Sequence, residues 1–189
     1  MEEAMRRCQE KFEFDITWRP FLLRPNVPPG GQPRTPGVGP PKTALDRVAA
    51  IGQTVGLNFT FSGDRIPNTL AAHVLLEHAA KVDGGKKQDS LQESIFKAFF
   101  TDGIYPDATN LSKIAKEHGF NEQEVYNLMS DEGNLEKAAS EANKWRSKGV
   151  SGVPFYFMNG QATFSGAQDP EAFVNMFETV ATKFPLSSK

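Results

Sequence analysis

The chain has 189 residues, of which 39% are apolar and 23% charged, and its 21 basic and 23 acidic side chains leave a formal net charge of −2. This balance excludes the basic surface typical of nucleic-acid-binding proteins, and no segment reaches the roughly 18 consecutive apolar residues of a membrane span. The single cysteine, Cys8, excludes an intramolecular disulfide, a cysteine zinc cluster and a Cys-x-x-Cys pair within the chain.

The first forty residues predict a helix, a strand and a loop. Residues 1–12 place apolar side chains at helical spacing, and nothing precedes Met1 to cap that helix. Residues 12–19 alternate apolar and polar side chains, which predicts a half-buried strand that ends at Pro20. Residues 20–41 are rich in proline and glycine and predict an irregular loop.

Residues 43–148 predict a contiguous α-helical region. Thr43 is expected to cap a helix that ends before Gly56, and Asn68 is expected to cap a helix through Ala80. Apolar spacing and turn residues predict further helices at 88–101, 111–118, 121–128 and 135–148.

After residue 148 the hydrophobic period changes from helix to strand. Residues 152–158 predict a strand, Asn159-Gly160 a two-residue hairpin turn, and residues 161–164 the partner strand. Asp169 is expected to cap the last helix, with Pro170 at its first position. The order predicts an α/β domain made of residues 1–42 and 149–189, interrupted by an α-helical subdomain at 43–148.

Few side chains suggest chemistry by themselves. The histidines lack the spacing of a helical metal pair, so no metal site is predicted. The phenylalanines, Phe96 and Phe157 among them, are interpreted as core residues. By its residues alone, the Val153-Pro154 bond favours a trans proline at a strand edge, where the missing N–H costs nothing, because a cis X-Pro bond is uncommon.

Several segments taken together resemble DsbA-family proteins of the FrnE subgroup. The segments are 149–157, 164–170, 18–21, 65–73 and 87–103. The resemblance implies a thioredoxin-like (DsbA-type) fold with a helical insertion and a thiol–disulfide oxidoreductase activity. It also implies that Val153-Pro154 is a cis-proline loop that presents the Val153 backbone to a thiol or disulfide peptide or protein, with His73 and Gln168 on the substrate side. For His73 the alternative, which its residue type favours, is a satisfied interior or surface histidine.

The sequence departs from the family at its redox motif. In the family a Cys-x-x-Cys lies between the first strand and the first helix, and here the first helix is already under way at Met1. We therefore expect an N-terminally truncated thioredoxin-like domain, or one that borrows a strand, with a slot about 10 Å wide beside the Val153 strand. Cys8 is expected to be a buried structural thiol. No catalytic residue is assigned, and the chain is expected to be inactive or impaired.

Two alternatives stay open. Kappa-class glutathione transferases and chromene-carboxylate isomerases resemble residues 164–170 and bind glutathione there, so glutathione is the one cofactor considered, although Asp169 would repel an anion. The second alternative is a non-catalytic peptide-binding protein that uses the proline-led strand edge. No nucleic-acid or membrane partner is expected, and the cytoplasm is the expected location because no export signal is visible.

Overall fold

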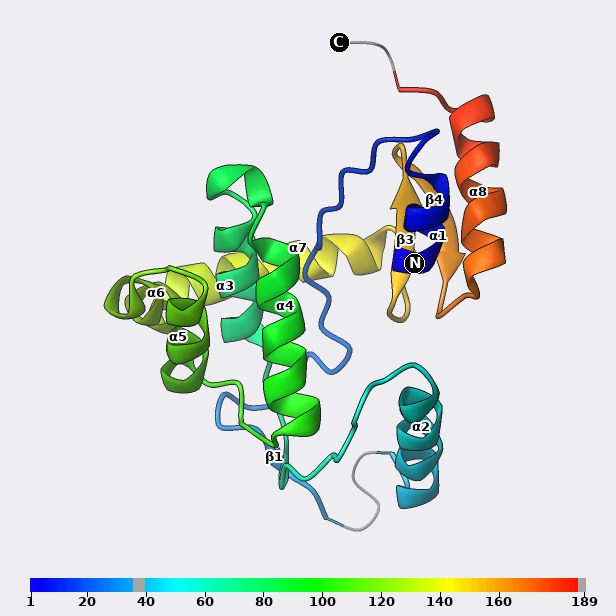
Figure 1. The fold of residues 1–189 in the computed structure, drawn as a ribbon. Helices are drawn as coiled ribbons and strands as arrows, with labels where there is room; N and C mark the ends of the chain where they lie inside the picture. Colours follow the sequence, from blue (N-terminus) through cyan, green and yellow to red (C-terminus); the bar gives the residue numbers. More distant parts are fainter. Residues whose placement is uncertain (36–39, 187–189) are drawn as a thin grey trace. The chain divides into compact units, whose positions relative to one another are not determined.

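The computed structural model describes residues 1–35 and 40–186. The chain forms two compact units (Figure 1): one is Met1–Ile16 with Trp145–Lys189, and the other is Thr17–Lys144. We call them the hairpin unit and the helical unit. The predicted boundaries at residues 42 and 148 stay a prediction.

The hairpin unit contains two helices and one two-stranded antiparallel sheet, α1 (Glu2–Cys8), β3 (Phe155–Met158), β4 (Gln161–Ser165) and α8 (Pro170–Lys183). Helix α1 packs against α8. Arg7 and Lys11 reach Glu171 and Glu178 of α8 at 2.8 Å each. The hydrogen bond and the charge of Glu171 raise the pKa of Arg7, and those of Glu178 raise the pKa of Lys11.

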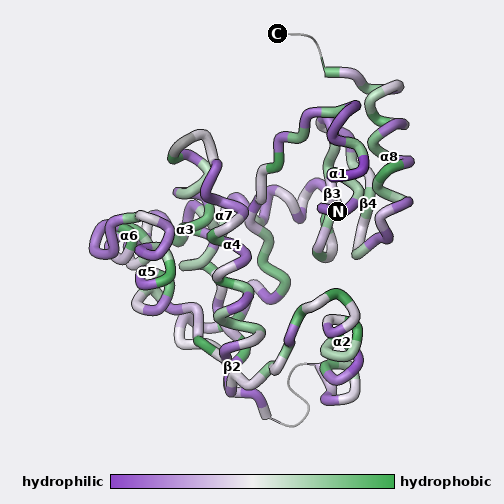
Figure 2. The backbone as a smooth tube through the Cα atoms, in the orientation of Figure 1, coloured by the Kyte–Doolittle hydropathy of each residue, from purple (hydrophilic) through white to green (hydrophobic). Residues whose placement is uncertain are grey.

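The helical unit holds most of the chain's helices. Its elements are β1 (Gln32–Pro33), α2 (Lys42–Thr54), β2 (Arg65–Ile66), α3 (Leu70–Ala79), the 3₁₀ turn η1 (Asp83–Gly85), α4 (Gln88–Phe96), its π-helical continuation η2 (Lys97–Thr101), α5 (Ala108–Glu117), α6 (Glu122–Ser130) and most of α7 (Glu132–Ser147). Side chains from α3 to α6 form the core, with Leu75, Leu91 and Leu111 fully buried. Figure 2 shows hydrophobic and hydrophilic residues interspersed along these helices, as expected when each helix buries one face.

The predicted helices are present, but two of the predicted caps are wrong in detail. Helix α2 begins at Lys42 after Pro41, with no side-chain cap, so Thr43 lies inside the helix. Helix α3 begins at Leu70, and Asn68 lies one residue before the N-cap, from where its Oδ1 accepts the Leu70 N–H at 3.0 Å.

The strand predicted at residues 12–19 is wrong. No strand is assigned there, because the backbone finds no neighbouring strand to pair with among the described residues. The aromatic residues in this segment pack as side chains instead: the Phe14 ring lies 4.9 Å from Phe177 of α8. The alternation of apolar and polar residues in this segment therefore reflects which side chains are buried, and not pairing in a sheet.

The loop predicted at residues 20–41 is not wholly irregular. Gln32 and Pro33 form β1, which pairs antiparallel with Arg65 and Ile66 of β2. Gly37 and Gly39, part of the predicted loop, lie outside the described residues. No helix in the described part of the chain is long and apolar enough to cross a membrane.

Candidate functional site

The β3–β4 hairpin carries the predicted proline-led strand. Asn159 and Gly160 both have positive φ, 47° and 78°, which is the geometry of a type I′ two-residue turn. The Val153-Pro154 peptide bond is cis. The cis bond agrees with what the family resemblance implies, and the trans proline that the residues alone favour is wrong. The Pro154 carbonyl accepts the Gly166 N–H at 2.8 Å, which extends the hairpin pairing past β3.

One edge of β3 has no partner strand among the residues described. Backbone N–H and C=O groups of successive residues point to alternate sides of a strand. Those of Pro154 and Met158 face β4, because the Pro154 carbonyl accepts the Gly166 N–H and Met158 pairs with Gln161 across the two-residue turn. The amides and carbonyls of Phe155 and Phe157 therefore face the outer edge. Val153, at the start of this edge, is 51% exposed.

The two faces of the hairpin differ in burial. On one face Tyr156 contacts Phe173 of α8, with ring centroids 5.0 Å apart, and burial raises the pKa of Tyr156. Phe173 is 1% exposed and anchors the hairpin on α8. On the other face Phe157 is 38% exposed and lies 5.3 Å from the Trp145 ring, so it is not the core residue that the sequence predicts.

Sequence reasoning missed Trp145 and Lys148 as neighbours of this edge. The Lys148 ammonium lies 4.5 Å from the centre of the Trp145 ring, and the Trp145 ring packs against Phe157 at an interplanar angle of 51°. Trp145 lies in the last turn of α7 and Lys148 follows its end, and the sequence assigns both to the helical insertion. In the structure they belong to the same compact unit as the hairpin.

The turn before α8 is closed by its own side chains. Gln168 Nε2 donates to the Ser165 carbonyl at 3.2 Å, and Asp169 accepts the Ala172 N–H at 2.8 Å as the predicted cap. Gln168 therefore lies in the same unit as Val153 and Pro154, but its amide is engaged in the turn. The capping carboxylate places a negative charge at the helix N-terminus, where an anion would otherwise bind.

His73 lies in the other compact unit, on α3. Its ring hydrogen-bonds with the Phe21 backbone, and burial lowers its pKa to about 4. A neutral imidazole held against backbone is a packing residue. The structure gives no arrangement that joins His73 to Val153, Pro154 and Gln168.

Cys8 is the last residue of α1 and is 3% exposed. A reactive thiolate is usually found at a helix N-terminus or beside a cationic group. The position of Cys8 agrees with the expected buried thiol. Among the described residues no group of three or more His, Cys, Asp or Glu side chains is arranged to hold a metal ion.

Comparison with known proteins shows the family. The model of the DSBA-like thioredoxin domain matches residues 1–178, so the chain belongs to this family. The structure is similar to the crystal structure of a probable DsbA oxidoreductase from Streptomyces coelicolor, with a TM-score of 0.80 and 23% identity, over 100% of this chain and 85% of that one. At this identity the likeness establishes the fold. No curated protein sequence matches the chain.

Proposed function

We propose that this DsbA-like chain binds an extended polypeptide segment by strand addition at the outer edge of β3, and that by itself it does not catalyse thiol–disulfide exchange. The observation that carries the proposal is the edge itself, where the Phe155 and Phe157 backbone groups face away from β4. Main-chain hydrogen bonds to such an edge supply affinity, and pockets for alternate side chains supply specificity. The family segments of the sequence favour the FrnE-like branch.

The lack of a second thiol supports the non-catalytic half of the proposal. Exchange needs an attacking thiolate and a second cysteine that resolves the mixed disulfide. The chain has only Cys8, which is buried at the C-terminal end of α1. The oxidoreductase activity of the family is therefore expected to be absent or severely impaired here.

The glutathione-dependent alternative has weaker support. Its anion would bind at the N-terminus of α8, where the Asp169 carboxylate already accepts the Ala172 N–H. We expect no measurable glutathione binding by calorimetry. Tight binding would favour a transferase or isomerase instead.

A peptide-binding experiment tests the strand-addition half. The probe is a short, soluble, fluorescently labelled peptide of alternating valine and threonine, titrated with the full chain and followed by anisotropy. Binding should persist when backbone N-methyl groups block one edge of the peptide, because the other edge can still pair with β3. Binding should vanish when N-methyl groups block both edges. Equal binding of the doubly blocked peptide, or no binding of the parent, would refute strand addition.

An insulin-reduction assay tests the catalytic half. We expect no turnover above that of the Cys8→Ser variant, and the same peptide affinity for both proteins. Robust turnover that the Cys8→Ser change abolishes would overturn the proposal.

A further inference from the structure

The helical unit contains a cleft that the proposed function does not use. It lies between one face of α3 and one face of α7, and it has a volume of about 340 Å³. Glu77, His78 and Lys81 project from the α3 side, and Lys137, Glu141 and Lys144 project from α7 at matching helical spacing. We call it the α3–α7 cleft.

The floor of the α3–α7 cleft is apolar. Val74 of α3 is 6% exposed and Ala138 of α7 is 5% exposed, and Leu128 of α6 packs against the same core. A volume of this size is at the lower end of the roughly 300–1,000 Å³ found for small-molecule sites. The cleft therefore suits a small ligand with an apolar body.

The charges that line the α3–α7 cleft are not fully compensated. Glu77 lies 3.8 Å from Arg19, but its Oε1 is buried without a hydrogen-bond partner among the described residues. Glu141 lies 2.8 Å from Lys144. Lys81 lines the cleft from the α3 side and Lys137 lines it from α7, and neither ammonium has an ion pair or hydrogen bond with the side chains that the structure describes. Two cations thus flank an apolar floor without a counter-ion.

We propose that the α3–α7 cleft binds a small organic carboxylate with an apolar tail. The carboxylate lies between the Lys81 and Lys137 ammonium groups, where opposite charges at short range attract. The tail lies on Val74, Leu128 and Ala138, where it removes apolar surface from water. Both lysines are exposed, so the attraction is moderate and is screened by salt.

Calorimetric titration of the full chain with octanoate tests this proposal. We expect saturable binding at low ionic strength that weakens as salt is raised. Octanol tests the need for charge and inorganic phosphate tests the need for the tail, so both should bind more weakly than octanoate. No octanoate binding, or equal binding of either control probe, would overturn the proposal.

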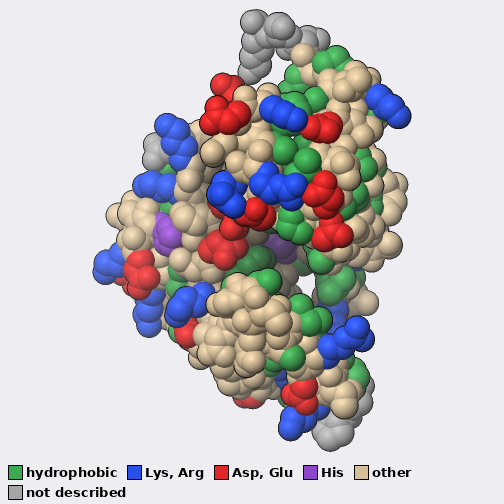
Figure 3. Space-filling model, turned by 45° about the vertical axis from the view of Figure 1, so that its right-hand side comes forward, with side chains coloured by type: hydrophobic (Ala, Val, Ile, Leu, Met, Phe, Trp, Pro, Cys, Tyr) green, Lys and Arg blue, Asp and Glu red, His purple; other side chains and the backbone are tan. Residues whose placement is uncertain are grey.

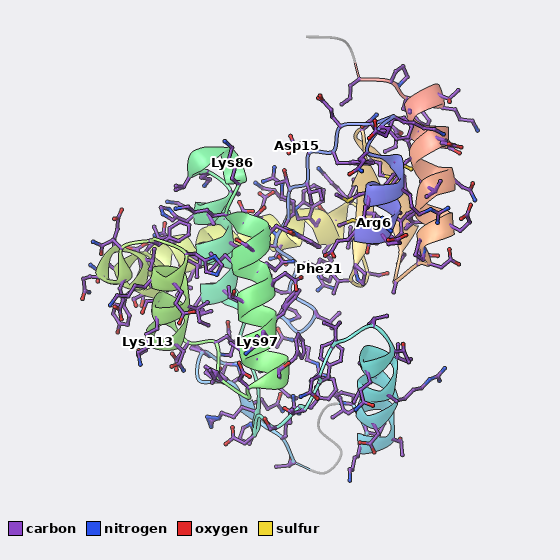
Figure 4. The ribbon with its side chains drawn as sticks, in the orientation of Figure 1. Arg6, Asp15, Phe21, Lys86, Lys97 and Lys113 are labelled. Carbon is purple, nitrogen blue, oxygen red and sulfur yellow. The ribbon has the colours of Figure 1, made fainter. Side chains whose placement is uncertain are left out.

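Variants of the cleft give a second test. Lys81→Ala and Lys137→Ala should each weaken octanoate binding roughly threefold, the effect expected of exposed ion pairs. Lys113→Ala, at an exposed lysine of α5 (Figure 4), is the matched control and should leave affinity unchanged. Ser140→Trp fills the cleft from an exposed position and should abolish binding without unfolding the core. Unchanged octanoate affinity in either lysine variant or in Ser140→Trp would refute this location.

Discussion

The side-chain amide of Gln88 forms a two-way hydrogen-bonded pair with the backbone of Trp18. The Trp18 N–H donates to Gln88 Oε1 at 3.0 Å, and Gln88 Nε2 donates to the Trp18 carbonyl at 3.1 Å. Gln88 is 2% exposed and also donates to the Leu76 carbonyl. The chain has no strand at Trp18, so a glutamine from α4 takes the place of a neighbouring strand for this residue.

Replacing Gln88 with alanine should therefore destabilise the protein by about 2 kcal/mol, because it leaves the Trp18 N–H and carbonyl with poorer partners. Urea denaturation followed by tryptophan fluorescence measures the change. Asp89→Asn is the control, since its exposed side chain retains an oxygen that can accept the Trp18 indole N–H, and it should change stability by less than about 0.5 kcal/mol. Equal stability of Gln88→Ala and the parent would contradict this role.

His73 should make stability depend on pH. Its pKa is about 4 when folded, against about 6.5 when unfolded, so the unfolded chain binds more protons between these values. Stability is therefore full above pH 6.5 and falls as the pH drops toward 4. The linked loss is about 3 kcal/mol for a difference of this size.

Denaturation midpoints between pH 4 and pH 7 check the His73 prediction. The His73→Gln variant should lose much of this slope, whatever its stability at neutral pH. His118→Gln, a change at another half-buried histidine of the helical unit, should retain the slope. A slope that is unchanged in His73→Gln would assign the effect to other groups.

Gly160 should stabilise the hairpin turn because glycine tolerates its backbone conformation, and not because a larger side chain would collide with a neighbour. A methyl group at Gly160 meets no atom within 4 Å, yet its φ is +78°. Gly160→Ala should cost about 1 kcal/mol, because an L residue disfavours this region. Gly152→Ala is a matched control in the same unit, with equally open space and no positive φ. Thermal melting of both variants measures the difference, and equal melting temperatures would refute the turn assignment.

Asp169 should stabilise α8 through its cap. Asp169→Ala removes the acceptor of the Ala172 N–H and should cost about 1 kcal/mol, whereas Asp169→Asn keeps an acceptor and should cost less. Chemical denaturation compares the two variants. A loss as large in Asp169→Asn as in Asp169→Ala would show that the negative charge at the helix N-terminus, and not the cap hydrogen bond, is responsible.

The surface of the protein agrees with the composition. On the face shown in Figure 3, acidic and basic side chains are interspersed rather than gathered by sign. A formal net charge of −2 predicts that the protein has no strong electrostatic field of one sign, but it does not predict which charged residues pair with each other. The pairing of Arg7 with Glu171, 164 residues apart, appears only in the structure.

Local signals predicted local features well. The Asn159-Gly160 turn and the Asp169 cap depend on residues within a few positions of one another, and both are confirmed. Features that need a distant partner were predicted poorly. The alternating apolar and polar residues at 12–19 are typical of a strand. A strand also needs a neighbouring strand to pair with, and the spacing of apolar residues does not show whether one is present.

By itself, the sequence determined the hairpin and its turn, the final helix, and the presence of a single thiol, because each follows from nearby residues or from a count. The fold family came from the resemblance of several sequence segments to known proteins. Only the tertiary structure decided that one edge of β3 has no partner strand among the described residues, that His73 is held neutral against the Phe21 backbone, and that Lys81 and Lys137 line the same cleft. These features join residues far apart in the chain, and the physical reason is that burial and charge compensation are properties of packed neighbours rather than of sequence neighbours.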